Sequence, residues 1–389
     1  MQNRVAQIAM AMAMVGLAAP SVCDGARREM IEVHVDGTAY TGQAVAYNAN
    51  TFWLLQRDGR LIRLPVQAVK QFRTVAPRFR AFRAREMRER LRKEFGPEFE
   101  VTGTRHYLVV APKGRARKYT QTFETVCRRF LSHFGAARFR LDKLKFPLVA
   151  VVFPNKRQFN EYAKRDGVNA TAMIAGYYHP RSNRIAVYDT VPTLSATRPH
   201  RKPQNAGPAT RFARPAGTNP RLHSTIIHET THQIAFNAGL HSRIGASPKW
   251  VVEGLATVFE APGIRNRTGG RGAASRINSG RLRRFQNYAK TRKPRSLSHF
   301  LAGDDPFRAT PLDAYAEAWA LSFFLMETQS RNYSKYLRLL AKRDPLKPYY
   351  ARDRLKDFQA AFGKDVDRLE VSFLRFIDDL RAADTPAAR

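Results

Sequence analysis

The sequence predicts an α+β protein in three parts: a small N-terminal antiparallel β domain, a mixed sheet with helices, and a helical C-terminal region. Three observations lead to this prediction. Short alternating apolar runs separated by Asp36-Gly37 and Asp58-Gly59 are typical of β-hairpins. Strand-like runs then alternate with helical patterns across residues 104–300, and only helical periodicity remains after residue 301. A chain of 389 residues is also long enough to bury more than one core.

Residues 1–25 predict a secretory signal peptide. Arg4 precedes a short apolar run from Ile8 to Ala19, and small residues follow it. An uncleaved N-terminal anchor is the alternative, although the run is short for a membrane span. No later stretch approaches the roughly 18 apolar residues of a spanning helix. We therefore expect no transmembrane span in the mature chain, and a secreted, periplasmic or cell-envelope location.

The chain is strongly basic and poor in cysteine. Its net charge is +35, from 67 Lys+Arg against 32 Asp+Glu, which usually indicates a polyanionic partner. The excess is spread along the chain without a nucleic-acid fold signature. We therefore expect anionic envelope polymers or acidic substrates as partners, and not nucleic acid. Of the two cysteines, Cys23 lies in the predicted signal and Cys127 lies on an apolar helix face, so we expect a buried thiol and no disulfide.

Residues 26–76 are expected to form a small β-barrel or SH3-like domain. Five short strands are predicted there, and this part has no catalytic constellation, so its expected role is to bind or position something. The charged helix Arg83–Phe95 follows, and residues 77–103 are expected to be a solvated helical linker.

Residues 104–300 are expected to form the mixed domain. The predicted strands are Tyr107–Val110, Phe146–Phe153 and the two arms of a hairpin at Met173–Asp189, and the predicted helices are Tyr119–Phe134 and the segment from Asn155 to Gly167. Residues 191–221 have no helix or strand period and are expected to be a flexible basic insertion. This insertion and residues 261–303 contain no Asp or Glu, so they would either rim a cleft and attract acidic substrates or form solvated basic loops.

Residues 301–389 are expected to be helical. Leu312–Thr328 is strongly apolar and predicts a core helix. Further helices are predicted near Tyr333–Lys342, Arg352–Phe362 and Val366–Ala382, and the last residues are expected to fray.

A metal-binding pattern lies in the predicted helix Ser224–Phe236. The pattern is His-Glu-x-x-His, formed by His228, Glu229 and His232. Residues four apart project from the same face of a helix, so the two imidazoles are expected to lie side by side. In this pattern the imidazoles bind zinc and the carboxylate acts on a water molecule at the metal.

The next predicted helix, residues 247–256, supplies the expected third ligand, Glu253. A Gly-containing connection is long enough to bring this helix back against the first. Gly254 has no side chain and would allow a close approach beside the metal. Four residues at the helix ends are predicted to cap or terminate the two helices: Ser224, Gly239, Ser247 and Pro248.

His228, Glu229, His232 and Glu253 together resemble the gluzincin metallopeptidases, whose third ligand is a Glu on the following helix. Thr225–Phe259 is similar to the peptidase-MA-like domain of a family of secreted bacterial proteins of unknown function, and the similarity extends from about Val33 to Phe285. The resemblance implies that residues 104–300 form a zincin-like metallopeptidase domain. It also implies that one strand of the hairpin pairs with an extended substrate, with two ordinary sheet strands as the alternative.

The resemblance further concerns two residues around the metal. Many gluzincins carry an acidic residue four positions after the Glu ligand, where this sequence has Thr257. The hydrogen-bond partner of His228 is therefore undecided, and Glu260 is a weak substitute candidate. Tyr315 resembles the Tyr that donates a hydrogen bond to the oxyanion in gluzincin aminopeptidases, with packing in the core as the alternative. His223 and Tyr178 are weaker candidates for the same role.

These observations predict a zinc-dependent hydrolase of peptide or other amide bonds. His228, His232 and Glu253 would bind Zn²⁺, Glu229 would be the general base and Tyr315 would stabilise the oxyanion. The expected substrate is a peptide or protein. One alternative is a non-catalytic envelope-associated protein that binds anionic polymers and has a structural or vestigial zinc site. Another is an amidase that acts on cell-wall peptides.

Overall fold

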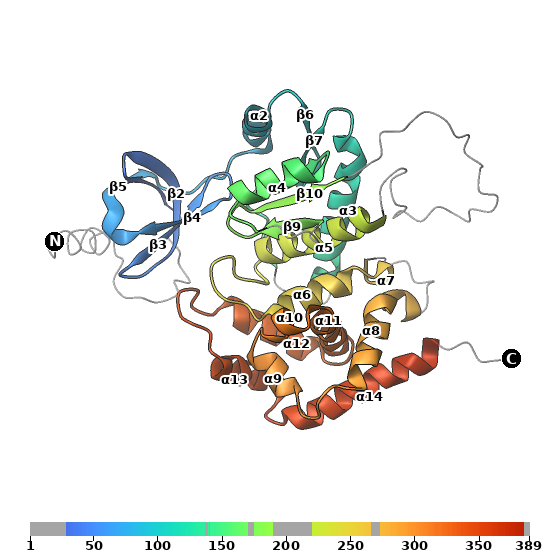
Figure 1. Ribbon diagram of the computed structural model, residues 1–389. Helices are drawn as coiled ribbons and strands as arrows, with labels where there is room; N and C mark the ends of the chain where they lie inside the picture. Colours follow the sequence, from blue (N-terminus) through green and yellow to red (C-terminus); the bar gives the residue numbers. More distant parts are fainter. Residues whose placement is uncertain are drawn as a thin grey trace, which may run out of the picture.

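The computed structural model describes residues 29–136, 139, 141–169, 175–189, 220–265 and 273–384. In this part of the chain an N-terminal antiparallel sheet is followed by a mixed sheet and a helical C-terminal region (Figure 1). The expected α+β class is therefore confirmed. The predicted signal peptide and nearly all of the predicted basic insertion lie outside the described residues, as do residues 385–389. None of the described helices is long and apolar enough to span a membrane.

The N-terminal sheet consists of five strands in the order β4-β3-β2-β1-β5, and each neighbouring pair is antiparallel. Its elements are β1 Met30–Val35, β2 Thr38–Tyr47, β3 Thr51–Gln56, β4 Leu61–Pro65, the 3-10 turn η1 Val66–Ala68 and β5 Val69–Ala76. Asp36 and Gly37 both have positive φ, 48° and 76°, as a tight two-residue hairpin turn requires. The Asp-Gly signal therefore predicted the β1–β2 hairpin correctly.

The mixed sheet has the order β6-β7-β8-β10-β9, with parallel pairing in the centre and antiparallel pairing at both edges. Its strands are β6 Phe99–Gly103, β7 Tyr107–Pro112, β8 Leu148–Phe153, β9 Gly176–His179 and β10 Arg184–Tyr188. The helices that cover it are α2 Ala84–Phe95, α3 Ala116–Ala136, α4 Lys156–Arg165 and α5 Pro220–Asn237.

Helices cover both faces of this mixed sheet. Alternate residues of β7 show the two sides: Tyr107 and Val109 pack with α3 and α5, whereas Leu108 and Val110 pack with α2 and α4. A strand that is buried on both faces is apolar throughout, which is why these strands were visible as continuous apolar runs. β9 is the outer strand on the side of α5, and it belongs to the hairpin that the sequence predicted.

Residues 77–103 differ from the expected solvated linker. Met87 and Leu91 of α2 are 2% and 0% exposed because they pack into the core of the mixed sheet, and β6 is a strand of that sheet. Glu94 of α2 also accepts two hydrogen bonds from the buried Arg184 of β10, of 2.6 and 2.9 Å. α2 is charged on its exposed surface and apolar on the face that packs on the sheet. Residues 77–103 therefore contribute a helix and a strand to the mixed α/β part of the protein.

The helical region contains the remaining elements of the described chain. These are α6 Lys249–Phe259, α7 Pro262–Arg265, η2 Ala273–Arg276, α8 Ser279–Ala289, α9 Leu297–Ala302, α10 Pro306–Ala309, α11 Pro311–Thr328, α12 Ser330–Ala341, α13 Ala351–Phe362 and α14 Val366–Asp384. The predicted core helix is α11, and its residues Ala314 and Ala316–Leu325 are buried.

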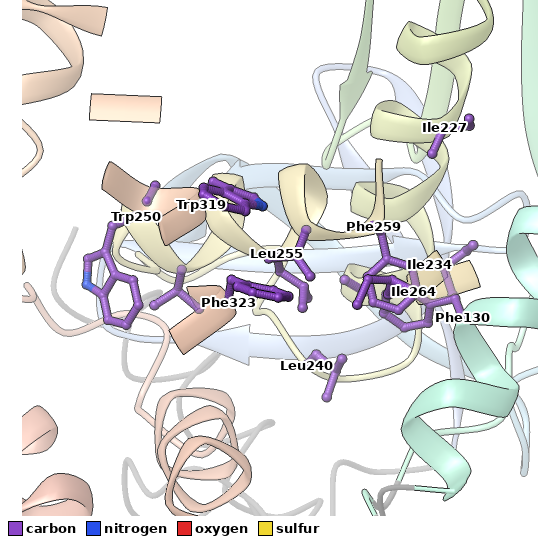
Figure 2. Packing of buried hydrophobic residues seen from close by; sticks show 14 of the residues in the cluster. Phe130, Ile227, Ile234, Leu240, Trp250, Leu255, Phe259, Ile264, Trp319 and Phe323 are labelled. Atoms are coloured by element: carbon purple, nitrogen blue, oxygen red, sulfur yellow. The ribbon is translucent and has the colours of Figure 1, made fainter. Parts of the chain in front are cut away.

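One apolar core joins the mixed sheet to the helical region. In Figure 2, Phe259 of α6 gathers with Phe130 of α3 and Ile234 of α5, while Leu255 of the same helix lies beside Phe323 of α11. The rings of Phe130 and Phe259 are 5.0 Å apart between centroids. α6 is therefore packed between α5 and α11, and this position sets what its side chains can reach.

Candidate metal centre

α5 is fixed on the mixed sheet by side chains on several of its faces. Ile226 and Ile234 are buried in the core, and Gln233 donates hydrogen bonds to the carbonyl oxygens of Val149 and Asn183, at 3.1 and 2.8 Å. These contacts anchor α5 against β8 and the start of β10. The orientation of the His-Glu-x-x-His face is thus set by packing on the opposite side.

The ends of the two helices differ in part from the prediction. α5 begins at Pro220, so Ser224 lies inside the helix and does not cap it. α6 begins at Lys249, with Pro248 at the capping position and no hydrogen bond from Ser247. Instead, the Asp304 carboxylate accepts a hydrogen bond of 3.0 Å from the Lys249 backbone N–H. Gly239 has φ 77°, as predicted for the residue after α5.

The close approach of α6 and α11 depends on Gly254. A Cβ atom at this position would lie 2.1 Å from Ser322 Oγ and 2.4 Å from the carbonyl oxygen of Ala318, both in α11. No larger residue fits there without a shift of α11. The close packing was predicted, and its partner is α11.

His228, His232 and Glu253 converge on one point. The Nε2 atoms of the two imidazoles are 3.0 Å apart, and Glu253 Oε2 is 3.3 Å from the first and 3.4 Å from the second. In a tetrahedral zinc site with bonds of about 2.0–2.1 Å, neighbouring ligand atoms are about 3.3 Å apart. The three atoms therefore have the spacing that a zinc ion requires, and the donor set of two imidazoles and one carboxylate suits this ion.

Glu260 is the partner of the first imidazole. Its Oε1 lies 2.8 Å from Nδ1 of His228, and its Oε2 accepts a hydrogen bond of 2.8 Å from Asn278 Nδ2. A proton on Nδ1 leaves the lone pair of Nε2 directed at the other two ligand atoms, as metal binding needs. Thr257 instead donates to the carbonyl oxygens of Glu253 and Gly254. The substitute that the sequence offered is thus the residue in contact.

The electrostatics of this cluster favour positive charge between the ligands. Burial disfavours a charged imidazole, yet hydrogen bonds with Glu253 and Glu260 raise the pKa of His228 well above its usual value. Burial likewise acts against ionisation of Glu253, yet the charges of the two imidazoles lower its pKa. Side chains of this cluster keep 10 to 15% of their surface exposed, so a small cation can reach them from solvent.

Glu229 lies beside the three ligand atoms without being one of them. Its Oε2 accepts a hydrogen bond of 2.7 Å from the backbone N–H of Tyr178 in the edge strand β9. Burial raises the pKa of Glu229, while the charges of His228 and His232 act in the opposite direction. The carboxylate is therefore held between the three candidate ligands and the outer edge of the mixed sheet.

The three predicted oxyanion donors occupy different positions. Burial raises the pKa of Tyr315, and the nearby carboxylates of Glu253 and Glu229 add to this effect, so its phenol faces the cluster. The Tyr178 phenol instead donates to Asn183 Oδ1 at 3.0 Å. His223 lies five residues before His228 on α5, which turns it away by about 140° on the helix. Of the three, Tyr315 is thus the one whose surroundings include both Glu253 and Glu229.

The basic segment 261–303 is tied mainly to acidic residues of the C-terminal helices. Arg276 pairs with Glu327, Arg284 pairs with Asp313, and Arg292 pairs with both Glu317 and Glu370. These contacts hold part of the segment against the C-terminal helices. Arg295 also pairs with Asp367, so four arginines in the described part of this segment have acidic partners, and Arg281 is not among them.

Sequence reasoning did not identify three residues near the centre: Lys249, Asn278 and Arg281. Asn278 carries a recognisable signal as the N-cap of α8, since its Oδ1 accepts a hydrogen bond of 3.3 Å from the Arg281 backbone N–H. Nothing in the sequence pairs it with Glu260 or pairs the two cations with Tyr315.

A cavity of about 450 Å³ between β4, α2, α4 and the β9–β10 turn is lined by none of these residues or the proposed ligands.

A comparison with protein families assigns part of the chain. A family model described as "Protein of unknown function (DUF1570)" matches residues 223–347, so a DUF1570 domain is present there. The matched segment contains α6, α8 and α11 and most of α5, and thus every residue named at the centre except Tyr178. No curated protein matches the chain.

Proposed function

We propose that this protein is a zinc-dependent hydrolase of peptide or other amide bonds, of the gluzincin type. The observation that carries the proposal is the convergence of His228, His232 and Glu253, with the Glu229 carboxylate beside them. The spacing of the three ligand atoms supports zinc as the ion. A carboxylate at the same centre that is not one of the three ligands supports catalysis, because a purely structural site does not need one.

A zinc ion held by these three residues would act as a Lewis acid and make a water molecule nucleophilic at neutral pH. Glu229 would accept the proton of that water through its carboxylate and deliver it to the leaving nitrogen. The hydrogen bond from the Tyr178 N–H holds this carboxylate in place on the side of β9. Glu260 would keep His228 in the tautomer with a free Nε2 lone pair.

Tyr315 would donate a hydrogen bond from its phenol to the oxyanion that develops on the scissile carbonyl. Its raised pKa keeps the phenol protonated, as a donor requires. The substrate would run along β9, the outer strand of the mixed sheet, and pair with its free edge as an added strand. Along an antiparallel strand, backbone N–H groups point alternately to its two neighbours. Tyr178 of β9 directs its N–H away from β10 and to Glu229, so the free edge of β9 faces the proposed base.

The proposal is tested with the zinc-loaded full-length protein, its Glu229→Gln variant and its His232→Ala variant. Metal analysis should find about one zinc per chain in the wild type and in Glu229→Gln, and a loss of zinc in His232→Ala. A peptide-library cleavage screen should detect hydrolysis by the wild type only. Hydrolysis by Glu229→Gln at the wild-type rate would exclude Glu229 as the base.

The same screen distinguishes the two other functions considered from the sequence. Zinc binding with no turnover, and salt-dependent binding of anionic envelope polymers, would favour a non-catalytic binding protein. Cleavage restricted to cell-wall peptides would favour an amidase with the same zinc chemistry. A secreted or envelope location remains an expectation from the N-terminal sequence.

A further inference from the structure

Two cationic side chains lie beside the phenol ring of Tyr315. Cζ of Arg281 is 5.4 Å from the ring centroid, and Nζ of Lys249 is 6.0 Å from it. All three side chains are partly exposed, so solvent and solutes can reach them. The ring of Phe307 packs edge-on against Tyr315 at 5.4 Å and fixes its orientation. The phenol is thus held rigidly with cations around it.

The position of Lys249 on α6 places this cation about one helical turn from the proposed ligand Glu253. Lys249 and Glu253 are four apart on α6, so they project from one face with about 6 Å between them. Arg281 lies three residues beyond Asn278, whose side chain binds Glu260. A helical turn is about 5.4 Å, which is comparable to the length of one or two residues of an extended chain.

Within the described residues, neither Lys249 nor Arg281 forms a salt bridge with an N–O distance of 4.0 Å or less. By contrast, Arg276, Arg284 and Arg292 in the same basic segment all form ion pairs with Asp or Glu. Two partly exposed cations that converge beside one phenol without a salt bridge of their own can pair with an anion from outside.

The charge around the centre indicates why such cations are needed. Glu229, Glu253 and Glu260, when ionised, contribute three negative charges, which exceed the two positive charges of a zinc ion. An anionic substrate would therefore be repelled from an otherwise negative centre. Lys249 and Arg281 reverse the sign of the local charge on the side of Tyr315.

We propose that Lys249 and Arg281, beside Tyr315, form a subsite for a substrate carboxylate located one or two residues from the scissile bond. The carboxylate would belong to an acidic side chain or to the C-terminus of a short peptide, so the preferred substrates are acidic next to the cleavage point. This inference rests on the proposed function, because it places the subsite relative to the zinc centre.

The test uses two hydroxamate probes of equal chain length on the zinc-loaded full-length protein. N-hydroxysuccinamic acid ends in a carboxylate, and butyrohydroxamic acid ends in a methyl group in its place. Calorimetry should give about tenfold tighter binding of the acidic probe, which corresponds to about 1.4 kcal/mol. Arg281→Gln and Lys249→Gln should each reduce this preference about threefold, and the double variant should abolish it.

Two further variants control the interpretation. Arg281→Lys keeps the charge and should retain most of the preference, whereas Arg283→Gln removes an exposed charge of the same helix and should retain all of it. The preference should also decrease as salt is raised from about 0.05 to 0.5 M. Zinc content and thermal unfolding check that each variant is folded.

The outcomes separate the subsite from the proposed function. Equal binding of the two probes to the wild-type protein would overturn the subsite alone. A loss of preference in Arg283→Gln as large as in Arg281→Gln would overturn it as well, because it would show that the net positive charge of the helix, and not a specific subsite, attracts the acidic probe. Binding of neither probe by a zinc-loaded protein would overturn the open metal position, and the subsite with it.

Discussion

The contact between Glu260 and His228 makes a quantitative prediction for zinc affinity. Glu260→Ala removes the acceptor that lies 2.8 Å from His228 Nδ1 and leaves Asn278 Nδ2 without its 2.8 Å partner. Loss of a carboxylate that orients a metal-ligating imidazole typically costs 10- to 100-fold in metal affinity. We expect about 100-fold for Glu260→Ala, or about 2.7 kcal/mol.

Glu260→Gln separates the two contributions of this residue. The amide has the same size, and its carbonyl oxygen can still accept from Nδ1, while the negative charge is lost. A hydrogen bond to a charged group is worth roughly 1 kcal/mol more than one between neutral groups, so we expect about a tenfold weaker zinc site. The order of affinities should be wild type, Glu260→Gln and then Glu260→Ala.

The assay is competition for zinc with a fluorescent chelator at fixed pH and salt. Glu327→Gln is the matched control, because Glu327 pairs with Arg276 and with no residue of the centre. It should keep the wild-type affinity. Unchanged zinc affinity in Glu260→Ala would refute the orienting role, and an equal loss in Glu327→Gln would point to a general charge effect.

Three further predictions concern packing, pH and the buried thiol. Gly254→Ala should lower the free energy of unfolding, measured in urea, by about 1–3 kcal/mol, because its Cβ would lie 2.1 Å from Ser322 Oγ. Gly280→Ala is the control, since its Cβ would meet nothing closer than 3.7 Å, and it should not show this loss. Burial raises the pKa of Glu317 to about 7 despite the opposing charge of Arg292. The free energy of unfolding is therefore greatest below the unfolded pKa of about 4.5 and should fall by at most about 3 kcal/mol as pH rises from there through 7, measured by thermal unfolding. A Glu317→Gln variant with the same pH slope would contradict this. Burial also raises the pKa of Cys127 to about 12, so a thiol reagent should modify it only in denaturant, and rapid modification of the native protein would show that the site opens.

The parts of the centre that follow local rules were predictable from the sequence. His228 and His232 share a face because the helix period brings residues four apart together. Glu253 and Glu260 are seven apart, which also places them on one face of α6, so the sequence contained a signal for the second carboxylate.

The contacts that the sequence did not predict cross between elements that are far apart in the chain. Asn278 meets Glu260 only because α8 packs against the end of α6, and Arg281 meets Tyr315 only because α8 and α11 are neighbours. No period or capping rule links these residues. The packing of α2 on the mixed sheet was missed for a related reason. Met87, Leu91 and Phe95 are the large apolar residues of an otherwise charged helix, and the sheet decides their burial.

Anomalous diffraction at the zinc absorption edge, from crystals of the zinc-loaded full-length protein, tests the central claim most directly. We predict one strong peak about 2.0–2.2 Å from Nε2 of His228, Nε2 of His232 and a carboxylate oxygen of Glu253, with Glu229 outside bonding distance. A zinc-loaded crystal in which these three residues bind no metal, or in which Glu229 completes a closed four-ligand site, would contradict the account.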